Sequence, residues 1–180
     1  MEAMVYVDGG SRGNPGPAAV GIVIVRTAPQ PRRALYEAGH PLGRTTNNVA
    51  EYTGLMRALE IAQELGVRRV GVRCDSQLMV RQVLGEYRVK SADLQPLHRR
   101  VVELSKGFER FDIEHVLRGK NARADELVNL ALDAGRNVIR VDAREGEVEA
   151  GDDEPPGGDA LSASDDAAGE GRPRFEVRVA

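Results

Sequence analysis

The chain begins with short apolar runs and continues with segments of helical character. Three apolar runs, each bounded by glycine, proline or polar residues, predict three strands in an antiparallel meander. Four later segments have the periodicity and the start or stop residues of helices, and two more apolar runs stand between them. We expect strands at residues 5–7, 18–26, 34–43, 68–75 and 110–117, and helices at residues 45–66, 76–85, 92–105 and 122–135.

This order of elements predicts a mixed α/β fold. Three antiparallel hairpin strands followed by two parallel strands would form one five-stranded sheet, and the helices would flank it. We expect residues 1–138 to form this domain and residues 139–180 to form an acidic Gly/Pro/Ala-rich disordered tail or linker.

The tail lacks the apolar residues that a packed core needs. It therefore cannot bury enough surface to offset the conformational entropy lost on ordering. We expect deletion of residues 141–180 to leave stability nearly unchanged, although the short run RFEVRV at 174–179 could pair as an edge strand.

The net charge of −3 conceals a division between the domain and the tail. Residues 141–180 hold 12 acidic and 4 basic residues, which leaves 16 acidic and 21 basic residues, a net charge of +5, in residues 1–140. A modest basic excess is compatible with nucleic-acid binding, and an ordinary solvated arginine surface explains it equally well.

The chain has no apolar stretch of about 18 residues, and no charged-then-apolar leader precedes the first strand. The one cysteine, Cys74, cannot form an internal disulfide, which fits a reducing compartment, and its apolar surroundings predict a buried side chain. We therefore expect a cytoplasmic monomer that does not bind membranes.

Four acidic residues stand at the ends of predicted elements. Asp8 and Asp75 each end an apolar strand, whereas Glu51 and Asp125 lie near the starts of the first and the last helix. The four converge only if the two helix starts pack beside the two strand ends. Taken singly, each acid also has an explanation without function, because acids favour the first turn of a helix and aspartate favours turns.

Four sequence blocks resemble the signature blocks of type 1 ribonuclease H. They are DGGSRGNPGP, TTNNVAEY, CDSQL and NARADELVN, and they carry the four acids in the family's order. The resemblance covers about residues 4 to 135. It implies a ribonuclease H-like fold and an endonuclease that hydrolyses the RNA strand of RNA–DNA hybrids, leaving 5′-phosphate and 3′-hydroxyl ends.

The resemblance also implies that the four acids hold two divalent cations. Carboxylate oxygens suit Mg²⁺, with Mn²⁺ as a substitute, and two ions about 4 Å apart can activate a water and stabilise the leaving oxygen. Asp8 would bridge both ions, Glu51 and Asp75 would hold one, and Asp125 would hold the other. Four close carboxylates repel one another, so we expect raised pKa values for some of them without metal. The glycines after Asp8 are expected to let nucleic acid approach it.

Neutral amides and backbone groups can read the 2′-hydroxyl that distinguishes RNA from DNA. The resemblance places Asn14, Asn48 and Gln77 on the RNA minor groove, together with the backbone near Gly10 and Ser11. It places Thr46 and Asn47 on the DNA side, where Thr46 would contact a phosphate. Arg12 is expected to meet a phosphate, and a solvent-facing loop arginine is the alternative. Helix capping is the alternative role for Asn47 and Asn48. The expected substrate-binding residues are Gly10, Ser11, Arg12, Asn14, Thr46, Asn47, Asn48, Gln77 and Asn121.

The loop before the last acid, RGKN, lacks the histidine that many relatives carry. The three histidines of the chain are His40, His98 and His115, and alternation predicts that His115 is a packed residue of the fifth strand. Arg118 resembles the arginine of a subgroup, and we expect it to take over part of the catalytic role by attracting a phosphate.

The chain also lacks the tryptophan-bearing basic helix that some members use to hold the substrate. Arg88 and Lys90 are the expected remaining phosphate contacts, so we expect weaker binding of the hybrid and a stronger dependence on salt. In some relatives a flexible linker joins a similar domain to a phosphatase-like domain, and the tail has the composition of such a linker.

Two other functions fit the same scaffold. One is a non-catalytic module that binds hybrids or RNA, and the presence of all four acids opposes it. The other is a different nuclease of the ribonuclease H-like superfamily, which the set of Asn14, Asn48 and Gln77 disfavours because these residues match RNA-reading positions.

Overall fold

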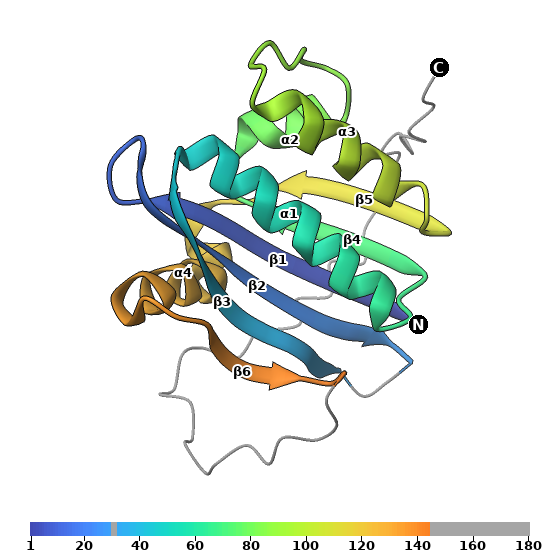
Figure 1. Ribbon diagram of the computed structural model, residues 1–180. Coiled ribbons are helices and arrows are strands. Elements are labelled where there is room, and N and C mark those ends of the chain that lie inside the picture. The colour runs from blue at the N-terminus through green and yellow to red at the C-terminus, as the bar shows by residue number, and fades with distance from the viewer. Residues whose placement is uncertain (30–31, 145–180) are drawn as a thin grey trace. The chain divides into compact units, whose positions relative to one another are not determined.

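The computed structural model describes residues 1–29 and 32–144, which form one sheet and the helices around it (Figure 1). In chain order the elements are β1 (Glu2–Ser11), β2 (Gly16–Ala28), β3 (Arg33–Thr45), α1 (Asn47–Glu64), β4 (Arg69–Cys74), α2 (Gln77–Val83), α3 (Leu94–Ser105), β5 (Arg110–His115), the 3-10 turn η1 (Arg118–Asn121), α4 (Ala122–Ala134) and β6 (Val138–Asp142). The α/β prediction and the order of helices and strands are confirmed.

The sheet has six strands in the order β5-β4-β1-β2-β3-β6. Strands β1, β2 and β3 form the expected antiparallel meander, and β4 and β5 lie parallel to β1. Parallel neighbours point their carboxyl ends at the same edge of a sheet, so residues that follow β1 and β4 meet there.

The predicted count of five strands is one too few, because β6 pairs antiparallel with the edge strand β3. The predicted domain boundary at residue 138 falls where β6 begins, and the strand continues into the stretch assigned to the tail. An edge strand with one buried residue in five carries little apolar periodicity, and the acidic composition downstream concealed it. Deletion of residues 141–180 therefore removes part of a paired strand. Residues 145–180, including the run 174–179, lie outside the described residues.

Hydroxyl side chains cap the starts of two helices, and a glycine ends a third. The Thr46 hydroxyl caps α1 by accepting a hydrogen bond from the Val49 amide at 3.3 Å, and Ser76 caps α2 by accepting from the Met79 amide at 3.4 Å. Gly135 ends α4 in the left-handed conformation at φ 62°. The capped starts of α1 and α2 lie near the edge of the sheet at which β1 and β4 end.

Helices cover both faces of the sheet (Figure 1). The larger core lies on the side of α1 and α3 and includes the fully buried Tyr52, Leu55 and Leu59 of α1, with Cys74 buried as expected. A smaller cluster lies beneath α4 and consists of Ala19, Val128 and Ala131. In the described part of the chain, no helix is both long and apolar enough to cross a membrane.

Glycines allow both helices to approach the strands closely. A Cβ at Gly9 would overlap the backbone of Ala50 and Glu51 in α1, and a Cβ at Gly21 would overlap the carbonyl of Ala124 in α4. The glycine after Asp8 therefore admits a helix of the protein itself, where the sequence had suggested nucleic acid. Both contacts involve residues that are, or adjoin, the acids Glu51 and Asp125.

An ion-pair cluster holds β6 at the edge of the sheet. Asp142 is only 2% exposed, and both of its carboxylate oxygens accept hydrogen bonds from Arg144, at 2.6 and 2.8 Å. The same guanidinium donates to Glu64 at 2.7 Å and lies 5.0 Å from the centre of the Tyr36 ring. Arg144 holds the pKa of Asp142 below its ordinary value, so this stabilisation is present at neutral pH and is lost as the pH falls through that lowered pKa.

Arg144→Ala is expected to lower the free energy of unfolding at neutral pH by about 3 kcal/mol, because it leaves the buried carboxylate of Asp142 without its partner. Urea denaturation followed by circular dichroism measures the change. Arg140→Ala, at an exposed position of β6, is the matched control and should have little effect. Equal stability of the two variants would contradict a stabilising role for this cluster.

Candidate active site

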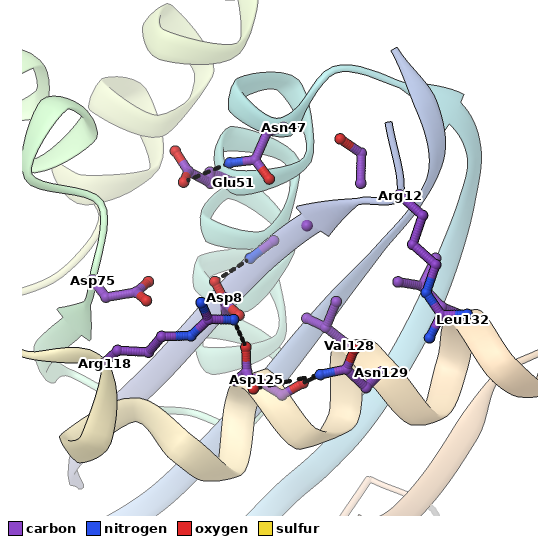
Figure 2. A pocket seen from close by; sticks show the side chains of 13 residues that line it. Asp8, Arg12, Asn47, Glu51, Asp75, Arg118, Asp125, Val128, Asn129 and Leu132 are labelled. Atoms are coloured by element: carbon purple, nitrogen blue, oxygen red, sulfur yellow. Dashed lines mark hydrogen bonds and ion pairs between the residues drawn. The ribbon is translucent and has the colours of Figure 1, made fainter. Parts of the chain in front are cut away.

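Four carboxylates line one cleft of about 270 Å³ at the edge of the sheet (Figure 2). Asp8 lies near the end of β1, Asp75 directly follows β4, Glu51 lies just beyond the first turn of α1, and Asp125 lies in the first turn of α4. The parallel strands β1 and β4 pair Tyr6 with Arg73, and Asp8 and Asp75 each follow two residues later along their chains. The two acids therefore stand at equivalent positions of neighbouring strands. The structure thus brings together the four acids that the sequence placed at the ends of elements.

Asp8 occupies the most unfavourable electrostatic position of the four. Burial, followed by the charges of Asp75 and Asp125, raises the pKa of Asp8 to about 7. The Gly9 amide donates a hydrogen bond to its carboxylate at 2.9 Å and partly opposes this shift. A positive charge in the cleft would remove this penalty.

Glu51 is held by two neutral donors. The Ser76 hydroxyl donates to one carboxylate oxygen at 2.6 Å, and the Asn47 amide donates to the other at 3.0 Å. Burial raises the pKa of Glu51, the Ser76 bond opposes that effect, and the charge of Asp75 adds to it. Ser76 thus caps α2 and fixes Glu51 with the same hydroxyl.

Asp125 is held by one charged and one neutral donor. Arg118 of η1 donates to its Oδ1 at 2.6 Å, and the Arg118 side chain is 76% exposed. Asn129, one turn further along α4, donates to the Asp125 carbonyl at 3.0 Å and to Oδ2 at 3.4 Å. Figure 2 shows Arg118 and Asn129 on either side of the Asp125 carboxylate.

The donor set fits a hard divalent cation, because the cleft offers carboxylate oxygens and the burial of Asp8 among negative charges favours a compensating positive charge. Within residues 1–29 and 32–144, no three acids, histidines or cysteines surround one point closely enough to hold an ion as they stand. Glu51 is engaged by Ser76 and Asn47, and Asp125 by Arg118. Because Arg118 is the positively charged partner among these donors, cation binding at Asp125 would require Arg118 to release it.

Five of the remaining predicted site residues line the cleft, namely Gly10, Ser11, Arg12, Asn47 and Arg118. Three further residues of α4 line it and escaped the sequence prediction: Val128, Asn129 and Leu132. Their spacing from Asp125 follows the helical period, so they share its side of α4, and this spacing was the available signal.

The other predicted substrate-binding residues lie outside the cleft lining. The Asn14 side-chain oxygen accepts a hydrogen bond from the backbone amide of Asn47 at 3.1 Å, and Thr46 caps α1. Asn48 and Gln77 are exposed in the first turns of α1 and α2. These positions lie at the starts of two helices beside Glu51 and Asp75, and their contacts with substrate stay a prediction.

Asn121 departs from its expected role. It is only 1% exposed, and its amide donates to the Val7 carbonyl at 2.9 Å. This bond ties the start of α4 to β1 beside Asp8, so the side chain faces the interior. A polar residue just before a helix gave no local signal of burial.

None of the three histidines lines the cleft. His40, on β3, contacts the Tyr36 hydroxyl at 2.7 Å, and His98, on α3, contacts the Gln82 carbonyl of α2 at 3.1 Å. His115 is exposed, which contradicts its predicted packing in the sheet. The alternation is real, but β5 is an edge strand and His115 is its last residue, where the side chain remains open to solvent.

Comparison with known proteins gives consistent matches. A family model described as reverse transcriptase-like matches residues 6–131, a stretch that contains all four acids. A bifunctional protein of Mycobacterium tuberculosis is 43% identical over 143 residues, which is 79% of this chain and 39% of that relative. The chain thus spans about two fifths of the length of this relative.

Two solved structures share the fold at high identity. RNase H1 from the halophilic archaeon Halobacterium salinarum matches with a TM-score of 0.70 and 44% identity, over 74% of this chain and 99% of that one. LC11-RNase H1, solved in complex with an RNA/DNA hybrid, matches with a TM-score of 0.68 and 43% identity, over 74% of this chain and 98% of that one.

Asp8→Asn is expected to stabilise the metal-free protein. The folded-state pKa of about 7 exceeds the ordinary 3.8, so the folded wild type binds more protons between these values and loses stability as the pH rises through them. Above about pH 7 the full penalty applies, on the order of 4 kcal/mol, and the neutral amide does not incur it.

Thermal unfolding in chelator measures this difference. The gain from Asp8→Asn should grow between about pH 4 and 7 and then level off, since the wild-type carboxylate is then ionised in both states. Asp93→Asn changes an exposed aspartate outside the cleft and is the control. A gain that did not change with pH would contradict the electrostatic explanation.

Proposed function

Because the chain belongs to the type 1 ribonuclease H family, we propose that it hydrolyses the RNA strand of RNA–DNA hybrids with two divalent cations, Mg²⁺ or Mn²⁺. The products are 5′-phosphate and 3′-hydroxyl ends. The observation that carries this proposal is the convergence of Asp8, Glu51, Asp75 and Asp125 from four separate elements on one cleft. The hybrid bound to the related LC11-RNase H1 supports the choice of substrate.

The chain's own residues prepare the cleft for this chemistry. When bound, the cations supply an activated water and neutralise charge at the scissile phosphate. Asp8, which is coupled electrostatically to the other three acids, would contribute to holding both cations, Glu51 and Asp75 would hold one, and Asp125 would hold the other. Ser76 and Asn47 orient Glu51 without adding charge, so its carboxylate keeps its full negative charge for a cation.

Arg118 has two successive partners in this proposal. In the structure it neutralises Asp125, and its high exposure leaves it free to turn. Released from Asp125, the guanidinium would donate to the scissile or product phosphate through charge-assisted hydrogen bonds. It cannot exchange protons near neutral pH, because an arginine pKa exceeds about 12.

The preference for the RNA strand of the hybrid comes from neutral groups beside the acids. The backbone at Gly10 and Ser11 lines the cleft, and the side chains of Asn14, Asn48 and Gln77 lie at its approaches. Amide and backbone groups can both donate to and accept from a 2′-hydroxyl, which only the RNA strand provides. These contacts favour a hybrid over duplex DNA.

Asp75→Asn is expected to reduce cleavage of a labelled hybrid in Mg²⁺ to below about a tenth of the wild-type rate, because it removes a cation ligand with almost no change in volume. Far-ultraviolet circular dichroism should be unchanged. Asp93→Asn is the control at an exposed position and should cleave normally. Wild-type protein that binds the hybrid but does not cleave it in Mg²⁺ or Mn²⁺ would support a non-catalytic binding module, and cleavage of duplex DNA would support another nuclease.

Arg118→Ala is expected to slow turnover by about ten- to a hundredfold, the scale of one lost charge-assisted contact. Steady-state rates on one hybrid at saturating Mg²⁺ measure this effect. His40→Ala, His98→Ala and His115→Ala should keep most of the activity, because none of these side chains lines the cleft. A folded His115→Ala protein as slow as Arg118→Ala would show that a histidine acts from the end of β5.

A further inference from the structure

Asn129 is the cleft residue for which neither the sequence blocks nor the proposed chemistry supplies a role. It lies on α4 one turn after Asp125, on the same side of the helix, and lines the cleft with it (Figure 2). Asparagine is a weak helix former in a helix interior, because its side chain competes for backbone hydrogen bonds. Here the amide bonds back to the helix at Asp125.

The two contacts of Asn129 fix both the backbone and the side chain of Asp125. Its amide nitrogen lies 3.0 Å from the Asp125 carbonyl and 3.4 Å from Oδ2. The contact with the carbonyl anchors the Asn129 amide on the helix, and the contact with Oδ2 holds one oxygen of the carboxylate. Arg118 holds the other oxygen by donating to Oδ1 at 2.6 Å. The carboxylate is therefore held from both sides, with Asp8 facing it across the cleft.

The two donors respond differently when a cation arrives. Arg118 is a positive group on an exposed side chain, so it competes with a cation for the same oxygen. Asn129 is neutral, bonds the other oxygen and is carried by the same helix as Asp125, so it can stay in place. Partners that orient a ligating carboxylate in this manner raise its affinity for metal.

We propose that Asn129 is a positioning residue, which keeps the Asp125 carboxylate turned toward Asp8 after Arg118 has left it and so strengthens cation binding at Asp125. This inference rests on the proposed cation site, and it assigns opposite effects to two donors of one carboxylate. Loss of Asn129 weakens cation binding, whereas loss of Arg118 leaves it equal or stronger because a competitor is removed.

Titration of the full chain with Mn²⁺ by calorimetry, together with the Mn²⁺ concentration for half-maximal cleavage, tests this proposal. Asn129→Ala should weaken Mn²⁺ binding by about tenfold and raise the half-maximal concentration to match, as expected for removal of a group that orients a ligand. Asn129→Gln keeps an amide donor that can reach an aspartate four residues away, and it should restore most of the affinity. Arg118→Ala should bind Mn²⁺ at least as tightly as the wild type.

Two controls separate positioning from loss of structure. Alanine is a better helix former than asparagine, so Asn129→Ala should be as stable as the wild type toward urea. Glu126→Ala removes an exposed residue of the same helix that pairs with Arg123, outside the cleft lining, and should leave Mn²⁺ binding unchanged.

Wild-type affinity for Mn²⁺ and a wild-type half-maximal concentration in Asn129→Ala would overturn the inference. Equal weakening in Arg118→Ala would also overturn it, because the two donors would then act alike. If the wild type bound Mn²⁺ and Asn129→Ala bound it more weakly, but no hybrid were cleaved, the proposed function would fail and the positioning role would stand.

Discussion

The mutual repulsion of four carboxylates around the partly buried Asp8 is the constraint on which the rest of the site depends. Burial and the neighbouring charges raise the pKa of Asp8 to about 7, so the metal-free fold carries an electrostatic cost at neutral pH. The remainder of the fold must supply the stability that keeps these groups together. It does so through two apolar layers and through hydrogen bonds that hold Asp8, Glu51 and Asp125 in place.

Close packing of helices against the sheet brings the acids within range of one another. Gly9 lets α1 lie against β1 at Ala50 and Glu51, and Gly21 lets α4 lie against β2 at Ala124. A side chain at either glycine would push a helix outward and carry its acid away from Asp8. Asn121 adds a buried tie between the start of α4 and β1, so the position of Asp125 is set by packing and by a hydrogen bond together.

The donors around the acids divide into neutral and charged groups. Ser76, Asn47 and Asn129 orient carboxylates while leaving them negative, which preserves the attraction for a cation. Arg118 neutralises Asp125 and lowers the repulsion in the metal-free protein. In the proposed function, this exposed arginine would then be available to a phosphate.

The sequence alone determined the features that depend on local or periodic information. Apolar periods predicted every helix and five of the strands, Thr46 and Ser76 cap helices as hydroxyl residues do, and the four acids stand at ends of elements where sheet edges meet solvent. Tertiary structure alone decided the features that depend on pairing and packing. Strand β6 exists because β3 offers an unpaired edge, and Asn121 is buried because α4 and β1 close over it. His115 is exposed because it is the last residue of the edge strand β5. Asn129 joins the site because α4 packs on the sheet with one side toward Asp8, and residue spacing states which positions share a side of a helix but not what that side faces.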